Sequence, residues 1–159
     1  MKFIGLLHIG PEFKHFCLSE SLKHKNKAHE GWEPIGHYFW SGNHADVKRY
    51  SKKSITHSCF VYNVSLELKK PLVIDGIFDI DVRKYIQNKY IKSAWVTFFS
   101  LGLGFGLGTL RNRITENLKQ EGYDGIVSND QVVCFNDNIK INSKSKYTLI
   151  NNKLIEDRA

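Results

Sequence analysis

The stretch that decides the fold runs from Leu118 to Asn136 and reads LKQEGYDGIVSNDQVVCFN. It begins within a helical pattern, Leu110–Gln120, whose apolar residues recur at every fourth position and which Gly122 ends. Two short apolar runs follow, Asp124–Val127 and Val132–Phe135, with a polar turn between them. This pattern predicts a helix that leads directly into two paired strands.

The sequence on either side adds more strands than helices. The other predicted strands are Phe3–Leu7, Gly36–Trp40, Cys59–Leu68 and Leu72–Ile74. A final hairpin joins either Ile139–Ile141 or Tyr147–Ile150 to Lys153–Ile155, with Asn151 and Asn152 as its turn. Further helices are predicted at His44–Lys52 and Val82–Phe99. Because the helices are few and do not alternate with the strands, we expect an α+β fold.

A glycine-rich apolar stretch interrupts this pattern. Residues 93 to 110 contain no charged side chain, and their number is close to the roughly 18 needed to span a membrane. Glycine occupies every second position from Gly102 to Gly108, and each glycine weakens a helix by about 1 kcal/mol. We therefore expect no membrane span but an apolar insertion at about 100–109, either a lid or a surface that a partner covers.

The composition is that of one globular domain covering residues 1–159, with 42% hydrophobic and 25% charged residues. The formal net charge is +7, and lysines gather at 23–27, 48–53 and 140–146. None of these clusters has an aromatic RNA-binding signature. The charge fits a solvated surface and attraction to a polyanion equally well. We expect a basic loop at about 19–31.

The cysteines and histidines favour a cytoplasmic protein without a metal. The three cysteines form no CxxC pair, which argues against a disulfide framework and a zinc site. The seven histidines include no HExxH spacing. The N-terminus lacks the apolar core and cleavage site of a signal peptide.

Three segments together resemble the ADP-ribosyltransferases, especially their small phage and toxin-associated branch. Leu6–Pro11, LLHIGP, is similar to that family's "LYHGT" strand end. Gly36–Ser41, GHYFWS, followed by Ala45–Tyr50, ADVKRY, is similar to its "GxYFT" strand and "AxxY" helix. Leu118–Val127 ahead of Gln131–Asn136 is similar to "LKxxGYDGI" and the strand that carries the catalytic acid.

The resemblance implies a split β-sheet core with a few helices around an NAD cleft. It implies an enzyme that moves ADP-ribose from NAD to a macromolecule, without a metal, as a toxin or phage effector. The basic charge favours a nucleic-acid acceptor slightly over a protein. The alternative is a catalytically weak or inactive module that binds NAD or ADP-ribose and acts through a partner. A third hypothesis is interaction only, in which the glycine-rich segment Leu101–Leu107 docks an antitoxin, a chaperone or another partner.

The resemblance also assigns roles to individual residues. His8 would bind the adenosine-side ribose, Tyr38 would pack on the nicotinamide, Tyr50 would form a second aromatic wall, and Gln131 would stand at the catalytic position. Further contacts with NAD fall on Ile9, Gly10, Trp40 and Ser41. Structural readings stand beside these roles: a hydrogen-bonded buried ring for His8, sheet packing for Tyr38 and core packing for Tyr50.

Gln131 departs from the pattern where it matters most. The family has a glutamate there, whose charge stabilises the oxocarbenium-like state, and the loss of such an interaction costs about 3–4 kcal/mol. Three explanations remain open. The chain is an inactivated Glu-to-Gln form, or the natural protein uses glutamine and is slow or only binds, or Asp130 or Glu121 supplies the charge.

Overall fold

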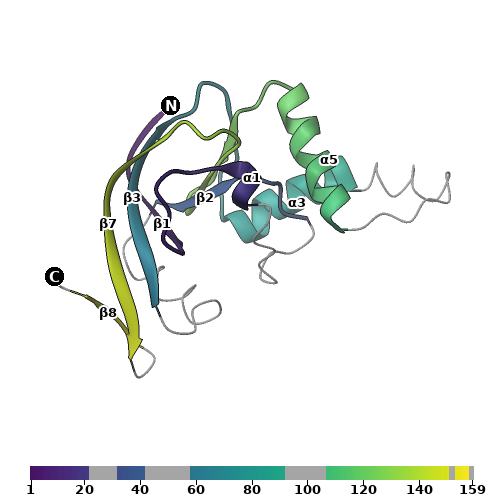
Figure 1. Cartoon of the computed structure of the whole chain (residues 1–159). Coiled ribbons are helices and arrows are strands. Elements are labelled where there is room, and N and C mark those ends of the chain that lie inside the picture. Colours follow the sequence, from purple (N-terminus) through teal and green to yellow (C-terminus); the bar gives the residue numbers. More distant parts are fainter. Residues whose placement is uncertain (22–31, 42–57, 92–106, 151–152, 158–159) are drawn as a thin grey trace.

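The computed structural model describes residues 1–21, 32–41, 58–91, 107–150 and 153–157. Their strands form one mixed sheet in the order β4-β5-β6-β2-β1-β3-β7-β8, shown in Figure 1. The strands are β1 (Lys2–Gly10), β2 (His37–Trp40), β3 (Ser58–Glu67), β4 (Pro71–Val73), β5 (Gly125–Val127), β6 (Gln131–Cys134), β7 (Ile139–Ile150) and β8 (Lys153–Glu156). Their pairing is antiparallel except for β4 with β5.

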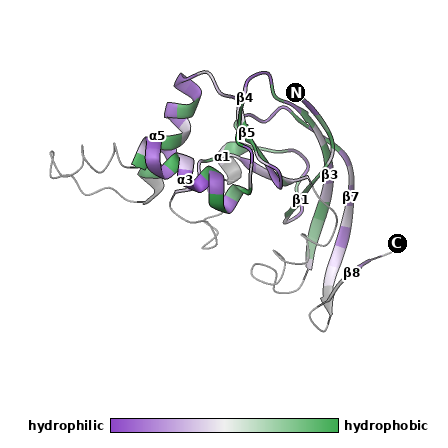
Figure 2. Ribbon diagram, turned by 180° about the vertical axis from the view of Figure 1, so that it is seen from behind, coloured by the Kyte–Doolittle hydropathy of each residue, from purple (hydrophilic) through white to green (hydrophobic). Residues whose placement is uncertain are grey.

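The helical elements lie against the β4-β5-β6-β2 half of the sheet (Figure 1). They are the π-helical turn η1 (Phe78–Val82), α3 (Arg83–Ile86), a second π-helical turn η2 (Gln87–Ile91) and α5 (Leu107–Gln120). The short helix α1 (Leu18–Ser21) is not among them, since Phe16 just before it belongs to the core on the other face. Purple and green residues are mixed along α5 in Figure 2, as expected for an amphipathic helix. The molecule is therefore α+β, as the sequence predicts.

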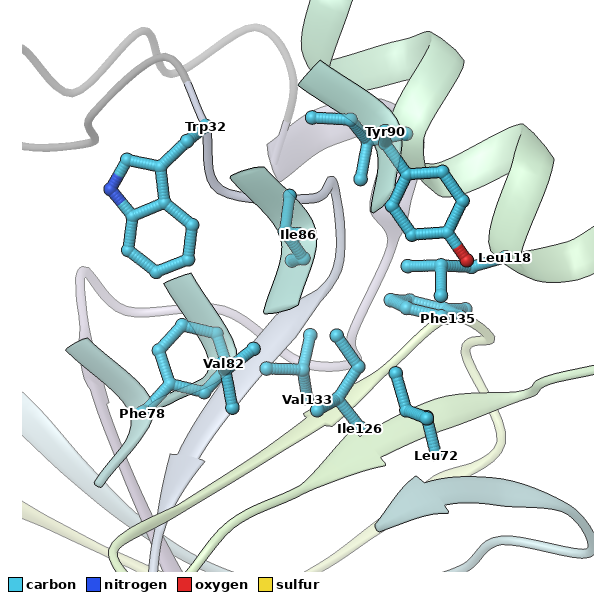
Figure 3. Close-up of a cluster of buried hydrophobic side chains, with 11 residues drawn as sticks. Trp32, Leu72, Phe78, Val82, Ile86, Tyr90, Leu118, Ile126, Val133 and Phe135 are labelled. Carbon is cyan, nitrogen blue, oxygen red and sulfur yellow. The ribbon is translucent and has the colours of Figure 1, made fainter. Parts of the chain in front are cut away.

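The first core lies between these helices and the sheet (Figure 3). The buried residues of the 78–91 segment recur at every fourth position: Phe78, Val82, Ile86 and Tyr90. This spacing places them in one row that faces the strands. Their buried partners are Trp32, Leu72, Ile114, Leu118, Ile126, Val133 and Phe135.

A second core covers the other face of the sheet. Its buried residues are Leu6, Phe16, Phe39, Tyr62, Val64, Leu66, Leu68, Val132 and Cys134. Val132 and Val133 of β6 belong to different cores because consecutive strand residues point to opposite faces. All four residues of β6 are buried, which explains why Val132, Val133 and Cys134 form an uninterrupted apolar run after Gln131.

The pairing of β1 with β2 forms a narrow junction within the sheet, and the split core that the resemblance implies stays a prediction. The described strands are hydrogen-bonded into one sheet, but the β1–β2 register consists of the single pair Leu7 and Trp40. By contrast, β1 and β3 share eight registered pairs and β3 and β7 share nine. The sheet therefore consists of two halves, β4-β5-β6-β2 and β1-β3-β7-β8, that meet at this pair.

The stretch that decides the fold behaves as its glycines suggest. Gly122 has a φ of 87° and ends α5. A Cβ at Gly125 would collide with the carbonyl oxygen of Val133, so only glycine lets β5 and β6 approach this closely. The Asp124 carboxylate accepts the backbone N–H groups of Lys69 at 2.5 Å and Lys70 at 3.1 Å, and so joins this stretch to the start of β4.

The predicted strands are confirmed, with differences at their ends. The two alternatives for the final hairpin are parts of one strand, β7, which pairs with β8. Its polar middle hides it in the sequence, and pairing with β3 overrides that weak local pattern. The helical segment begins at Phe78 instead of Val82, and α5 begins at Leu107 instead of Leu110.

Several predictions fall outside the described residues. These are the helix at 44–52, the end of the helix predicted over 82–99, the basic loop beyond residue 21 and the glycine-rich insertion up to residue 106. In the part of the chain that the structure describes, no helix has the length and apolar character to cross a membrane.

Candidate functional site

Three of the predicted site residues share one face of the sheet where β2 lies beside β6. Trp40 stands directly opposite Gln131 in the antiparallel register, and Tyr38 stands opposite Val133. Opposed residues of an antiparallel pair point to the same face, as do residues two apart in one strand. Tyr38, Trp40 and Gln131 therefore face the same side, although about 90 residues separate the two strands in the chain. We call these three residues the β2–β6 face.

Ser41, the fourth predicted residue of this region, links β2 to the turn that precedes Gln131. Its backbone N–H donates to the carbonyl oxygen of Asp130 at 3.2 Å. Its hydroxyl donates to the carbonyl oxygen of Asn129 at 3.0 Å. Ser41 is therefore a structural contact of the turn.

The turn from Ser128 to Gln131 is held by its own side chains. Ser128 Oγ accepts the Gln131 N–H at 3.1 Å and lies 2.9 Å from Asp130 Oδ1. Asp130 Oδ1 also accepts the backbone N–H of Phe78 at 2.8 Å, at the first turn of η1. The Asp130 carboxylate thus connects the turn to the helical layer. The sequence marks these residues only as a turn; their serine-x-aspartate spacing is the signal that points to such a network.

Gln131 itself is buried, with 3% of its surface exposed. An uncharged amide can occupy such a position at moderate cost if it is hydrogen-bonded, whereas an unpaired carboxylate would lose several kcal/mol of solvation. The surroundings of residue 131 are therefore compatible with a neutral side chain.

Tyr38 contributes to packing as well as to this face. Its hydroxyl donates to the carbonyl oxygen of Pro34 at 2.5 Å. Its ring meets that of Phe78 edge-on, with 5.7 Å between the ring centroids. The ring is thus fixed against the first core and leaves part of its surface exposed.

His8 lies on the opposite face of the sheet. Leu7 is registered with Trp40, so the next residue, His8, points to the other side, where it is registered with Tyr62. Its ring is surrounded by those of Phe13, Phe16, Phe39 and Tyr62, at centroid distances of 5.1–6.2 Å. The structure does not bring the His8 ring together with the β2–β6 face.

The His8 ring bridges the narrow junction of the sheet. Its Nδ1 lies 2.8 Å from the carbonyl oxygen of Tyr38, an acceptor, so Nδ1 carries the proton. Burial lowers the pKa of His8 to about 4, more than the hydrogen bond to Tyr38 raises it. The ring is therefore neutral at pH 7. The half-buried, hydrogen-bonded ring fits the structural reading, and a role of His8 toward a ribose stays a prediction.

The neighbouring positions divide between the two faces. Ile9 packs with Leu7, Val61 and Tyr147 on the side of the sheet that carries Trp40. Gly10 ends β1, and a Cβ there would come within 3.2 Å of His8 Nε2. Tyr50 lies outside the described residues.

Glu121, the second alternative source of charge, is engaged elsewhere. Its carboxylate accepts Lys89 Nζ at 2.5 Å and the hydroxyl of Tyr90 at 3.0 Å, just after the end of α5. The hydrogen bond from Lys89 lowers the pKa of Glu121. Among the described residues, no group of histidine, cysteine or acidic side chains is arranged to hold a metal ion.

Comparisons of the chain with protein-family models, curated proteins and solved structures found no match. The assignment of a function therefore depends on the sequence motifs and on the geometry described above.

Proposed function

We propose that this protein is an ADP-ribosyltransferase that binds NAD on the β2–β6 face and transfers ADP-ribose to a macromolecular acceptor. The observation that carries the proposal is the register of β2 with β6, which sets Trp40 opposite Gln131 and Tyr38 on the same side. These residues belong to two of the segments that resemble the family. If these three residues bind the nicotinamide and its ribose together, they must be neighbours in space.

The proposed chemistry breaks the bond between nicotinamide and ribose. Nicotinamide leaves with the bonding electrons, and positive charge develops on the ribose in an oxocarbenium-like state. The rings of Tyr38 and Trp40 would hold the nicotinamide, while residue 131 would accept a hydrogen bond from the ribose 2′-hydroxyl. The acceptor then forms a bond to the ribose C1′ and releases a proton. Gln131 supplies the hydrogen bond without the charge, so we expect slow transfer.

The charge distribution supports a nucleic-acid acceptor. The described residues contain 14 lysines and arginines and 14 aspartates and glutamates, so they are neutral overall. The net charge of +7 therefore belongs to the remaining segments of the sequence. One of them, 42–57, directly follows Ser41 in the chain. A basic segment that follows Ser41 in the sequence would attract a polyanion. We therefore propose nucleic acid as the acceptor, and a toxin or phage effector as the role of the protein.

A second candidate is an NAD- or ADP-ribose-binding module that performs no transfer. Two observations favour it: residue 131 is a buried amide, and the His8 ring lies on the opposite face of the sheet. The candidate carboxylates of Asp130 and Glu121 are both engaged in other contacts. Such a module would act through a protein partner.

The test is NAD turnover, measured by mass spectrometry, for the unmodified protein, Gln131→Glu and Gln120→Glu. Total RNA, DNA and cell lysate are offered as acceptors. Gln120 is exposed on α5, so its variant makes the same chemical change away from the proposed site. We expect Gln131→Glu to raise transfer about 100-fold or more, and Gln120→Glu to leave it unchanged.

Thermal unfolding of each variant controls for the burial of a carboxylate at position 131. If folded Gln131→Glu consumes no NAD with any acceptor, the transferase proposal is wrong. Measurable NAD binding by the same samples would then support the binding module.

A further inference from the structure

A patch of aromatic and basic side chains lies on the second-core side of the β1-β3-β7-β8 half, away from the β2–β6 face. Phe60 and Tyr62 of β3 are registered with Lys146 and Lys144 of β7, so the four side chains share one face. The ring of Phe13 stacks on Tyr62 with a centroid distance of 4.1 Å and an interplanar angle of 13°. We call Phe13, Phe60, Lys144 and Lys146 the β3–β7 patch.

The patch combines half-buried flat rings with exposed cations. Phe13 and Phe60 are partly accessible, whereas both lysines are exposed. Lys144 Nζ lies 5.3 Å from the centroid of the Phe60 ring. Residues at positions i and i+2 of a strand are about 7 Å apart and point to the same face. Lys144 and Lys146 therefore present two closely spaced charges on one face of β7.

A carboxylate of the chain itself already occupies the position where an anion would bind. Glu12 Oε1 accepts Lys144 Nζ at 2.7 Å. The pKa of Glu12 is lowered mainly by this hydrogen bond and by the charge of Lys144, with a smaller effect of Lys146. The positive fields of both lysines therefore meet at this carboxylate.

This carboxylate is exchangeable. The side chains of Lys144 and Glu12 are 43% and 61% exposed, and ion pairs this accessible contribute little to stability. Lys146 has a similar exposed partner, Asp157, at 3.4 Å. A polymer with repeated phosphates can replace such pairs and release counterions.

We propose that the β3–β7 patch binds single-stranded nucleic acid, with phosphates displacing Glu12 from Lys144 and bases stacking on Phe13 and Phe60. Stacking platforms interleaved with cations are how proteins bind single strands without sequence preference, because every base has a π-face. Binding at the patch does not require the proposed function. Only the further step, that the bound single-stranded nucleic acid is the acceptor of ADP-ribose, rests on the proposed function.

The experiment measures binding of a fluorescein-labelled 20-nucleotide uridine oligomer to the full chain by anisotropy, without NAD, over a range of salt. Lys144→Gln combined with Lys146→Gln removes two phosphate contacts. We expect about 25-fold weaker binding at 0.1 M salt and a salt slope reduced by about 1.4. The matched control, Lys69→Gln with Lys84→Gln, removes two other exposed lysines and should have a much smaller effect.

Glu12→Gln provides a test of opposite sign. Removing the competing carboxylate should tighten binding, by up to about fivefold at 0.1 M salt, the value of one phosphate contact. Its control is Glu116→Gln, which removes an exposed carboxylate from α5 and should change binding much less. Thermal unfolding confirms that each variant is folded.

The inference is overturned if the unmodified protein does not bind the oligomer, or if the patch variants behave like their controls. Equal binding to phosphatidylserine-containing vesicles with the same dependence on Lys144 and Lys146 would assign the patch to a lipid surface instead. Because NAD is absent, these outcomes are independent of transferase activity. Binding through the patch combined with no NAD turnover by Gln131→Glu would reject the transferase proposal alone.

Discussion

His8 and Gln131, the two residues most important for the proposed chemistry, meet different environments on opposite faces of the sheet. Gln131 belongs to a fully buried strand and faces the same side as Tyr38 and Trp40. The ring of His8 is surrounded by aromatic side chains and hydrogen-bonded to the Tyr38 carbonyl oxygen. At the residue scale, His8 therefore joins the halves of the sheet, and Gln131 remains the candidate for contact with the ribose.

The burial of His8 predicts a dependence of stability on pH. Its pKa is about 4 in the folded protein and 6.5 in its ordinary state, so the unfolded chain binds more protons between these values. The free energy of unfolding should fall by about 2–3 kcal/mol as pH decreases from 6.5 to 4.5. Burial also lowers the pKa of His37, which acts in the same direction.

Urea unfolding at pH 6.5 and 4.5 checks this prediction. Because protonation of carboxylates also reduces stability in acid, the informative quantity is the difference between variants. His8→Leu should reduce the loss of stability by most of the 2–3 kcal/mol, while His15→Leu, at an exposed position, should leave it unchanged. Equal losses of stability in the unmodified protein and in both variants would contradict the attribution of this pH dependence to His8.

At the scale of elements, the turn between β5 and β6 determines where β6 begins. Ser128, Asp130 and Ser41 connect this turn to η1 and to the end of β2. Three elements from distant parts of the chain therefore meet at the residue that precedes Gln131. A loose turn would let Gln131 move relative to Trp40.

Asp130→Ala should destabilise the protein by about 1–3 kcal/mol, because it removes the acceptor of the Phe78 N–H next to a buried side chain. Asp130→Asn keeps an acceptor oxygen for the Phe78 N–H and should therefore lose less stability than Asp130→Ala. Glu67→Ala, at the exposed end of β3, is the control for removing a carboxylate. Urea unfolding measures all three, and the prediction fails if Asp130→Ala is no less stable than Glu67→Ala.

The strands were predictable from sequence because apolar residues alternate or run together within each of them. Cys59–Leu68 is predicted, for example, and β3 covers Ser58–Glu67. The face of His8 was not predictable. A register shift between Ile4 and Leu6 brings Phe3, Leu6 and the His8 ring to the same side of the sheet. Such a bulge depends on pairing with β3, which local periodicity does not encode.

The candidate site is a property of the whole molecule. Tyr38 and Gln131 are both apparent as motif positions, but only the long-range pairing of β2 with β6 makes them neighbours. The β3–β7 patch was missed for the same reason. No aromatic residue pattern accompanies the lysines near residue 144 in the sequence. The aromatic rings of the patch come from elsewhere in the chain, from β3 and from the segment after β1.

At the scale of the whole molecule, the two halves of the sheet have different proposed tasks. The half with β4, β5, β6 and β2 carries the β2–β6 face and the helical layer. The half with β1, β3, β7 and β8 carries the β3–β7 patch. Leu7 and Trp40 form the single registered pair between the halves. In this proposal NAD and nucleic acid bind to the same sheet, one on each side of that junction.

The measurement that tests the central claim most directly is hydrogen–deuterium exchange of the unmodified protein with and without millimolar NAD. Binding on the β2–β6 face predicts slower exchange at 36–41 and 128–134, and little change in β7 and β8. No protection anywhere, or protection confined to β7 and β8, would contradict the claim that this protein binds NAD where β2 meets β6.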